Sequence, residues 1–331
     1  MVEAAQSLAG VAVVAIGRNE GERLRACLTS VVRSAQIVVY VDSGSTDDSV
    51  EMARQMGVEV VVLPKDVVFT AALARNAGWR RALELAPEIE FVQFVDGDCA
   101  VDPSWLATAR AFLTDHADVV AVCGRRRERF PERSIYNLLC DIEWAATPGE
   151  SKACGGDVMM RAVGLQAVNG YNPRLIAGEE PELCLRLRNK GWRVWRLDAE
   201  MTLHDAAMTR ISQWWKRSMR AGYTFAEGVH MHGAPPERHR VVESRRAWVW
   251  GLVIPLVALL GALLIHPWAL ALLLVYPLQM LRLFRGFRGP FKQRAARAMF
   301  MVLGKFAEAC GQLKFVALRL SGGTARLIEY K

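Results

Sequence analysis

The stretch EFVQFVDGDCAVDPSWL, residues 90–106, decides how this chain folds. It begins with a mostly apolar run, Phe91 to Val95, which predicts a buried strand, because strands covered on both faces read as continuous apolar runs. Two carboxylates, Asp96 and Asp98, follow directly with only Gly97 between them. Like charges this close repel each other, and a divalent cation relieves the repulsion. The stretch therefore predicts a strand that ends at a metal site.

Strands and helices alternate in the sequence before this stretch. Apolar, β-branched runs at 11–16, 37–41 and 58–63 predict strands, and helical spacing of apolar residues predicts helices at 20–33, 46–56 and 71–85. The alternation predicts an α/β fold with a mostly parallel sheet flanked by helices. Ligands of such sheets bind at the carboxyl ends of the strands, where this chain has the loops GRNE, DSGSTDD, PKD and DGD. We expect the functional site in these loops.

Composition and charge limit the class of protein. The chain has 331 residues, 52% of them hydrophobic, which allows a sizeable core and excludes overall disorder. The net charge of +8 favours anionic partners such as nucleotides or phospholipid surfaces. No nucleic-acid-binding motif accompanies the basic residues, so nucleic acid is not expected as a partner. Seven cysteines without regular spacing, and an N-terminus without a signal peptide, favour a reducing, cytosolic environment.

The C-terminal third is apolar to a degree that is rare in soluble domains. No Asp, Glu, Lys or Arg occurs from Ala247 to Leu281, and the 18 uncharged residues from Trp248 to Ile265 would extend about 27 Å as a helix, close to the hydrocarbon thickness of a bilayer. Arginines on both sides place both flanks in the cytoplasm. Two tilted spanning helices, a re-entrant segment, an in-plane segment and a buried hairpin of a soluble protein all stay open.

Five stretches occur in the order and rough spacing of one known family. They are VAVVAIGRNE from residue 11, VVYVDSGSTDDS from 38, ALARNAG from 72, FVQFVDGDC from 91 and AGEEPELCLRLRNKGW from 177. On these motifs, residues 10 to 230 resemble the family 2 glycosyltransferases, of the membrane-associated bacterial type, which have the GT-A fold. The resemblance implies an inverting transferase that takes a sugar from a nucleotide-sugar donor and uses Mn²⁺ or Mg²⁺ bound at a DxD motif.

The resemblance assigns roles on the donor side. Asp42 matches the acidic position that reads the nucleoside, Arg75 matches the basic residue near the donor diphosphate, and Asn19 and Glu20 match the loop after the first strand. Many members have two consecutive acids where this chain has Asp42 and Ser43, which leaves the nucleobase open. The residues themselves also allow purely structural interpretations, in which Asp42 is a turn or capping acid and Arg75 lies on a solvated helix face.

The metal site is expected at the DGD tripeptide. Asp96 and Asp98 are the expected ligands, and Gly97 lets the donor diphosphate approach the backbone. His204, which follows a probable strand, matches a position that is a third metal ligand in related enzymes. A single histidine with only a structural role is the alternative.

The motif GEEPELCLRL supplies candidates for the catalytic base. Inverting transfer needs a carboxylate that takes the proton of the attacking hydroxyl. Pro181 suits the first position of a helix, which places Glu180 at the helix start. By resemblance the second acid of this motif, Glu180, is the base, and Glu179 is expected to orient the acceptor. The helix dipole lowers the pKa of a carboxylate there and burial raises it, so the sign of the net shift stays open.

Other residues are candidates for the acceptor side. Asp157 ends the Gly-rich turn CGGD, and Trp214 and Trp215 can stack on an acceptor sugar or pack a helix. The basic run at 125–133 predicts a solvated loop, with a phosphate-binding role for its arginines as the alternative.

These expectations combine into two domains. Residues 1–232 form the catalytic domain, with a nucleotide-binding half at about 10–100 and an acceptor half at about 101–232. Residues 233–331 form a membrane-associated helical region with an apolar hairpin at 247–284 and an interfacial helix at about 295–320. The enzyme is expected on the cytoplasmic face of the inner membrane, integral or monotopic, and to act on a lipid-linked or membrane-borne acceptor. A metal-dependent nucleotidyltransferase and a non-catalytic scaffold of the same fold are the alternatives.

Overall fold

The structure is a computed structural model that describes residues 8–323. These residues form two compact units. The first takes in the described residues of Met1–Phe130 and Cys140–Ala206, and the second those of Pro131–Leu139 and Ala207–Lys331. The short η1 (Pro131–Arg133) belongs to the second unit, and α5 (Ile135–Trp144) spans the division.

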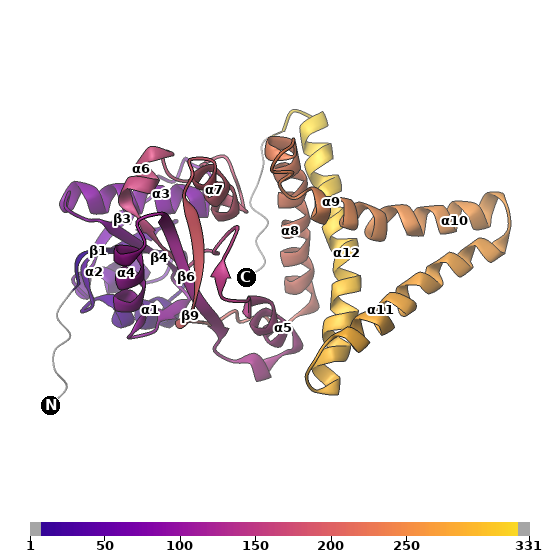
Figure 1. The fold of residues 1–331 in the computed structure, drawn as a ribbon, viewed down its shortest axis with the longest axis horizontal. Helices are drawn as coiled ribbons and strands as arrows, with labels where there is room; N and C mark the ends of the chain where they lie inside the picture. Colours follow the sequence, from indigo (N-terminus) through magenta and orange to yellow (C-terminus); the bar gives the residue numbers. More distant parts are fainter. Residues whose placement is uncertain (1–7, 324–331) are drawn as a thin grey trace. The chain divides into compact units, whose positions relative to one another are not determined.

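The first unit is a sheet with helices on both faces (Figure 1). Its strands are β1 (Leu8–Gly17), β2 (Ala35–Asp42), β3 (Glu59–Val62), β4 (Phe91–Asp96), β5 (Cys99–Val101), β6 (Val119–Glu128), β7 (Gly149–Glu150), β8 (Val158–Arg161) and β9 (Arg193–His204). Its helices are α1 (Glu22–Val31), α2 (Ser49–Gln55), α3 (Ala71–Leu85), α4 (Trp105–Asp115), α6 (Ala162–Ala167) and α7 (Glu179–Arg188). The predicted strands and helices before residue 96 are therefore all present.

The strand order explains where ligands can approach. The order is β3-β2-β1-β4-β8-β6-β9-β5, with β7 paired to β9. The first four of these are mutually parallel, whereas β8 runs antiparallel to both β4 and β6. The carboxyl ends of β1, β2 and β4 therefore meet at one edge, and the predicted α/β fold with a mostly parallel sheet is confirmed.

Two buried clusters hold the helices to the sheet. On one face Leu24 of α1 and Trp105 of α4 pack with inward residues of β1 and β4, and on the other Trp79 of α3 and Leu183 of α7 do the same. Burial of large apolar side chains on both faces supplies the main stabilisation. It also fixes the loops after β1, β2 and β4, because each of these loops begins at a buried strand.

The second unit is helical. It contains α8 (Ile211–His232), a continuous helical stretch of α9 (Val241–Trp248), η2 (Val249–Val253) and α10 (Ile254–Leu264), then η3 (Pro267–Leu274), α11 (Val275–Gly286) and α12 (Phe291–Leu320). Helices α8 and α12 lie side by side, and Gly311 permits this approach, because a Cβ there would lie 1.9 Å from the carbonyl oxygen of Met219. The division into compact units thus groups α8 with the C-terminal helices, whereas the expected catalytic domain extends to residue 232.

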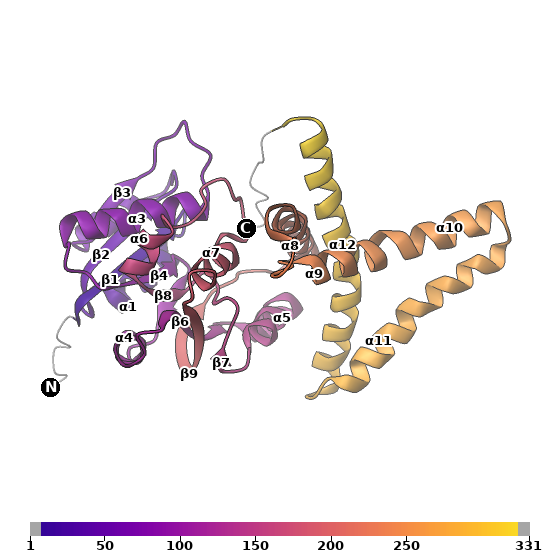
Figure 2. The same cartoon turned by 45° about the horizontal axis from the view of Figure 1, so that its top comes forward.

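An apolar hairpin projects from α8 and α12 within this unit (Figure 2). Val241–Leu264 and Pro267–Gly286 are both long and apolar enough to cross a membrane. Within the most apolar 18 residues of each segment, only 11% and 6% respectively are buried. A buried core hairpin would hide these side chains, so the structure does not support that alternative. At the turn Ile265 is 86% exposed.

The predicted interfacial helix is part of α12. Among the apolar residues of this helix, Val302 and Ala309 are buried, whereas Leu313, Val316 and Leu320 are exposed. One face of the helix is therefore used for packing within the unit, and an apolar face remains at the surface. Its membrane role stays a prediction.

Candidate active site

The DGD tripeptide connects β4 to β5 at the carboxyl edge of the sheet. The amide of Gly97 donates to the carbonyl oxygen of Ile16 at 2.8 Å, and a Cβ at position 97 would lie 3.0 Å from that same oxygen. A glycine is therefore favoured here because the backbone of β1 approaches so closely. The two aspartates are held at fixed positions on either side of this contact.

Asp96 lies between two arginines from different elements. Its Oδ1 accepts a hydrogen bond from Nη2 of Arg75 on α3 at 2.8 Å, and its Oδ2 accepts one from Nη2 of Arg126 on β6 at 3.0 Å. Burial raises the pKa of the Asp96 carboxyl, but the two guanidinium groups outweigh it and hold that pKa well below its usual range. Asp96 is thus ionised and balanced by the protein's own cations.

Arg75 also holds the start of α7. It is 2% exposed, and its Nη1 donates to Oε1 of Glu179 at 2.5 Å. Burial lowers the pKa of the guanidinium, and Asp96 and Glu179 raise it by more. The interpretation of Arg75 as a residue on a solvated helix face is therefore wrong. The contact found for Glu179 is to Arg75, and its role toward an acceptor stays a prediction.

Asp157 completes this network from the CGGD turn. Its Oδ1 accepts from the backbone amide of Asp96 at 3.0 Å, and its Oδ2 accepts from Nε of Arg126 at 2.8 Å and from Oγ1 of Thr202 at 2.7 Å. Arg126 belongs to β6, so the predicted solvated loop at 125–133 is wrong for its first four residues. Asp157 is 1% exposed, which makes it a support for Asp96 and Arg126. Its proposed acceptor role stays a prediction.

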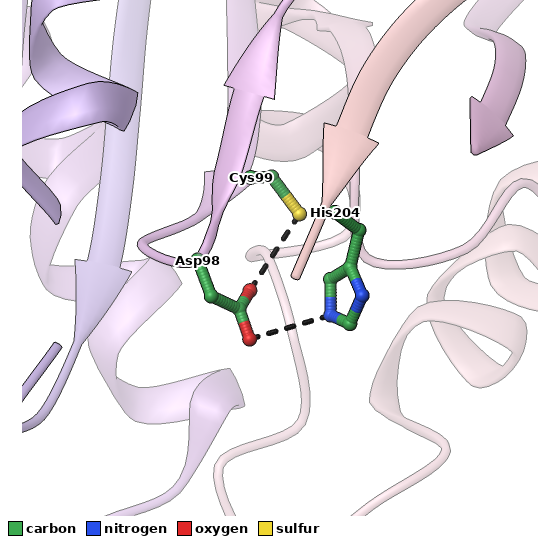
Figure 3. A group of neighbouring side chains, drawn as sticks. All are labelled: Asp98, Cys99 and His204. Carbon is green, nitrogen blue, oxygen red and sulfur yellow. Dashed lines mark hydrogen bonds and ion pairs between the residues drawn. The ribbon is translucent and has the colours of Figure 1, made fainter. Parts of the chain in front are cut away.

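Asp98 has different neighbours. Its Oδ2 lies 3.3 Å from Nε2 of His204, and the thiol of Cys99 lies 3.6 Å from its Oδ1 (Figure 3). On the far side of the imidazole, Nδ1 lies 3.4 Å from Oε2 of Glu128. Histidine ligands of metals commonly have such a carboxylate behind the ring, since it fixes the tautomer and directs the other nitrogen to the metal.

Asp98, Cys99 and His204 together suit a divalent cation. Burial lowers the pKa of His204, which favours the neutral imidazole. A neutral imidazole carries one N–H and cannot donate to both Glu128 and Asp98. When that proton faces Glu128, the lone pair of Nε2 faces the Asp98 carboxylate, and a cation between them removes the conflict. Ligand atoms of Asp98, Cys99 and His204 all lie within 4.8 Å of one another.

A second group of possible ligands suits a cation less well. Oxygen and sulfur atoms of Asp96, Cys99 and Asp157 also lie within 4.8 Å of one another. Both carboxylates already accept hydrogen bonds from Arg126, which supplies positive charge at that place. The predicted metal role is therefore supported for Asp98 and His204 more directly than for Asp96.

Glu180 is buried at the start of α7. The helix begins at Glu179, so Pro181 is its third residue rather than its first. Oε1 of Glu180 accepts from the amide of Cys154 at 2.7 Å and from the thiol of Cys184 at 2.8 Å. Oε2 is buried and has no hydrogen-bond partner among residues 8–323. Burial raises the pKa of Glu180 despite these hydrogen bonds.

The loops after β1 and β2 are joined by their polar side chains. Oδ1 of Asn19 accepts from the amide of Thr46 at 2.7 Å, and Glu20 pairs with Arg23 at 2.7 Å. The amide of Ser43 donates to the carbonyl oxygen of Gly17 at 3.0 Å. These contacts shape the edge of the sheet where the donor is expected.

Asp42 supports its own turn. It is 1% exposed, and it accepts hydrogen bonds from the hydroxyl of Tyr40 and from the amides of Gly44 and Ser45, each at 2.9 Å. A role as a turn acid is therefore visible in the structure. The donor-binding roles of Asn19, Glu20, Asp42 and Ser43 stay predictions.

The two tryptophans lie in the second unit. Trp214 is 6% exposed, and its ring centroid lies 4.8 Å from that of Phe300 on α12. Trp215 contacts Trp214 edge to face at 6.4 Å. For Trp214 these contacts favour helix packing over stacking on an acceptor sugar.

Sequence reasoning missed three supporting groups. Arg126 lies in a run of basic residues, and such a run predicts a solvated loop. A strand through Val119–Glu128 places alternate side chains on opposite faces of the sheet, so it would have distinguished Arg126 from Arg125 and Arg127. Glu128 lies in no quoted motif, and the motif that contains Cys184 points to its acids and not to this cysteine. Only the fold brings them to His204 and Glu180.

Solved structures of known proteins share the fold of this chain. The mannosyltransferase PcManGT from Pyrobaculum calidifontis, solved in complex with GDP-Man and Mn²⁺, has a TM-score of 0.62 at 19% identity, over 92% of this chain and 86% of that chain. Residues 1–349 of TarS from S. aureus give 0.48 at 16% identity, over 96% and 93%. Glucosyl-3-phosphoglycerate synthase from Mycobacterium tuberculosis gives 0.48 at 18%, over 68% and 81%. The fold assignment rests on the first of these.

Fold and sequence together define a glycosyltransferase with the GT-A fold. Residues 12–153 match the family model Glycosyl transferase family 2, which covers β1 to β7. The resemblance of the sequence motifs to the family 2 glycosyltransferases and their GT-A fold is confirmed, whereas the membrane-associated bacterial type stays a prediction.

Proposed function

We propose that this glycosyltransferase is an inverting, metal-dependent enzyme that moves a sugar from a nucleotide-sugar donor to a hydroxyl of a lipid-linked or membrane-borne acceptor. The observation that carries the proposal is the pairing of Asp98 with His204, backed by Glu128, in the same unit as a buried carboxylate, Glu180. A metal site and a base are the two parts that such a transfer requires.

Asp98 and His204 would hold the metal ion. A divalent cation, Mn²⁺ or Mg²⁺, would act as a Lewis acid that neutralises charge on the departing nucleoside diphosphate. Mn²⁺ suits the mixed oxygen and nitrogen ligands better than Mg²⁺, which prefers oxygen. The mannosyltransferase of similar fold was solved with GDP-Man and Mn²⁺, which supports a nucleotide sugar and a divalent metal here.

Arg75 and Arg126 organise the carboxylates around this site. Together they hold Asp96 ionised and tie it to Glu179 and Asp157. Several ion pairs and hydrogen bonds between the same groups restrict the positions that these side chains can take. The network therefore fixes the end of β4 and the start of α7 relative to each other, and with them Asp98 and Glu180.

Glu180 is the proposed base. In inverting transfer the acceptor hydroxyl attacks the anomeric carbon from the face opposite the leaving diphosphate, and its proton passes to a carboxylate. Oε2 of Glu180 is available for that proton, because it has no partner among the described residues. The raised pKa of Glu180 makes it a stronger base than an exposed glutamate.

The exposed hairpin supports a membrane-borne acceptor. Leu263, Leu264 and Trp268 are each at least 75% exposed near the turn. Large contiguous exposed apolar surfaces mark contact with another apolar phase. An enzyme held at the bilayer by this hairpin would meet acceptors that are themselves lipid-anchored. The basic flanks favour the cytoplasmic face of the inner membrane.

Product analysis tests the reaction. Full-length enzyme with Mn²⁺ and a panel of nucleotide sugars should release the nucleoside diphosphate, and the new glycosidic bond should have the opposite anomeric configuration by NMR. Glu180→Gln should lower kcat by about a thousandfold without loss of metal binding. Release of pyrophosphate would indicate nucleotidyl transfer instead. Retained configuration would contradict the role of Glu180.

Vesicle flotation tests the membrane part. Leu263→Glu with Trp268→Glu should shift the full-length protein from vesicles of anionic lipid to the soluble fraction, and transfer to native membranes should fall with it. Leu85→Glu, also at an exposed leucine but on α3, is the matched control. Undiminished flotation of the double variant would contradict membrane attachment through the hairpin.

A further inference from the structure

Two donors to Glu180, one a thiol and one a backbone amide, converge on the same carboxylate oxygen. Cys184 is four residues after Glu180 on α7, a spacing that places both side chains on the same face of the helix. Its thiol and the amide of Cys154 both donate to Oε1, at 2.8 and 2.7 Å. Oε2 is left buried without a donor from residues 8–323. The carboxylate is thus held by one oxygen and unsatisfied at the other.

We propose that the thiol of Cys184, with the backbone amide of Cys154, is a positioning group that fixes Glu180 so that Oε2 alone receives the proton of the acceptor hydroxyl. The inference rests on the proposed function, in which Glu180 is the base. A buried oxygen without a partner is costly, and an acceptor hydroxyl would supply the missing donor. The same contact orients the hydroxyl for proton transfer.

The surroundings of Glu180 keep this arrangement intact at neutral pH. The groups that face it are Glu179, itself paired with Arg75, the buried Tyr171, and the thiols of Cys154 and Cys184. The backbone amides of Cys154 and Gly155 also act on the carboxyl and lower the pKa of Glu180. The thiol contact with Cys154 lowers the pKa of Cys184, but burial and Glu180 raise it to about 11. Burial raises the pKa of Cys154 well above its usual value. Cys184 therefore stays a thiol at neutral pH, and its S–H group donates a hydrogen bond to Oε1 of Glu180.

The thiol has an effect on catalysis that packing alone would not have. A donor to the charged form of a carboxylate favours ionisation and opposes the effect of burial. Without the thiol, Glu180 would remain protonated to a higher pH. Its carboxylate would also be free to rotate, because only one of the two hydrogen bonds to Oε1 would remain. Serine at position 184 would retain a donor, because the present sulfur–oxygen distance of 2.8 Å leaves room for the shorter Cβ–O bond.

The experiment is the pH dependence of kcat/KM for full-length wild type and four variants. Cys184→Ala and Cys184→Val remove the donor, and Cys184→Ser keeps it. Cys140→Ala is the control, since Cys140 is also a buried cysteine but lies on α5. The two variants without a donor should shift the acid limb of the profile to higher pH and lose about tenfold in kcat/KM on that limb. Serine should restore the wild-type limb, and the control should follow wild type.

Three results would separate the possible failures. Profiles of Cys184→Ala and Cys184→Val that coincide with wild type would overturn the inference while leaving the proposed function intact. An equal shift in Cys184→Ser would also overturn it, because the effect would then come from packing. Wild-type activity in Glu180→Gln would overturn the assignment of the base itself. If the alanine variant does not fold, valine, which fills the space of the thiol, gives the same comparison.

Discussion

Asp96 and Asp98 are separated by one glycine, yet they lie in different electrostatic surroundings. Asp96 accepts hydrogen bonds from the guanidinium groups of Arg75 and Arg126, which hold it ionised. Asp98 lies against the imidazole of His204 and the thiol of Cys99. The first environment supplies cations from the protein, and the second supplies further metal ligands.

The two carboxylates of one short motif therefore serve two purposes. A strand that ends in two carboxylates delivers both to one edge of the sheet, but elements distant in sequence decide what each carboxylate does. Helix α3 and strand β6 turn Asp96 into the centre of an ion-pair network, and the end of β9 gives Asp98 a histidine. We therefore expect substitutions at the two positions to have different consequences.

The largest expected effect is that of Asp98→Asn. The variant should lose Mn²⁺ binding by calorimetry, and transfer should fall by about a thousandfold, since a group that stabilises developing charge is lost. Its unfolding midpoint in urea should stay close to that of wild type. Asp115→Asn, at an exposed acid on α4, is the control. Wild-type metal affinity in Asp98→Asn would contradict the assignment.

Glu128→Gln should weaken the metal site without removing a ligand. The amide keeps a contact with the imidazole of His204 but no longer stabilises its N–H with a full charge, so metal affinity should fall by about 10- to 100-fold. Excess Mn²⁺ should then restore most of the activity. Activity that stays low at saturating Mn²⁺ would place Glu128 in another role.

Asp96→Asn should act mainly on stability. The variant leaves Arg75 and Arg126 without their shared carboxylate, which should cost about 2 kcal/mol in the free energy of unfolding, less than a fully buried pair because the Asp96 side chain is 30% exposed. Glu200→Gln breaks the half-exposed pair with Arg127 and should cost under about 1 kcal/mol. Equal losses of unfolding free energy in the two variants would show that the Asp96 network stabilises the fold no more than an exposed ion pair does.

The smallest effect is a pH dependence of stability from Glu180. Its raised pKa means that the native state binds a proton more tightly than the unfolded state, so its contribution to stability falls as pH rises from the unfolded pKa through the folded pKa. Glu180→Gln removes this dependence. Urea unfolding at a series of pH values should therefore show wild type losing stability relative to Glu180→Gln as pH rises. The opposite slope would contradict the burial effect.

Much of the fold could be predicted because the first 96 residues alternate between two clear periodicities. The strand before Asp96 and the helix at Ala71–Leu85 were both predicted with accurate bounds, since buried strands and amphipathic helices leave strong local patterns. The later strands are shorter or more polar. The arginines of β6 resemble a surface loop because three of them are consecutive.

The site could be predicted in its motif residues and not in their partners. Asp98, His204 and Glu180 stand at strand or helix ends, where local sequence signals their place. Pairing of Arg126 with Asp96 depends on which strands become neighbours, and β6 meets β4 only through β8. The burial that raises the pKa of Glu180 likewise depends on the packing of the whole unit.

The most direct test of the account is pulsed EPR of Mn²⁺ bound to the full-length protein in the presence of a nucleoside diphosphate. If Asp98 and His204 hold the ion, wild type should show a nitrogen coupling from the imidazole, and His204→Gln should lose that coupling while still folding. A wild-type spectrum without nitrogen coupling, or the same coupling in His204→Gln, would contradict the proposed metal site.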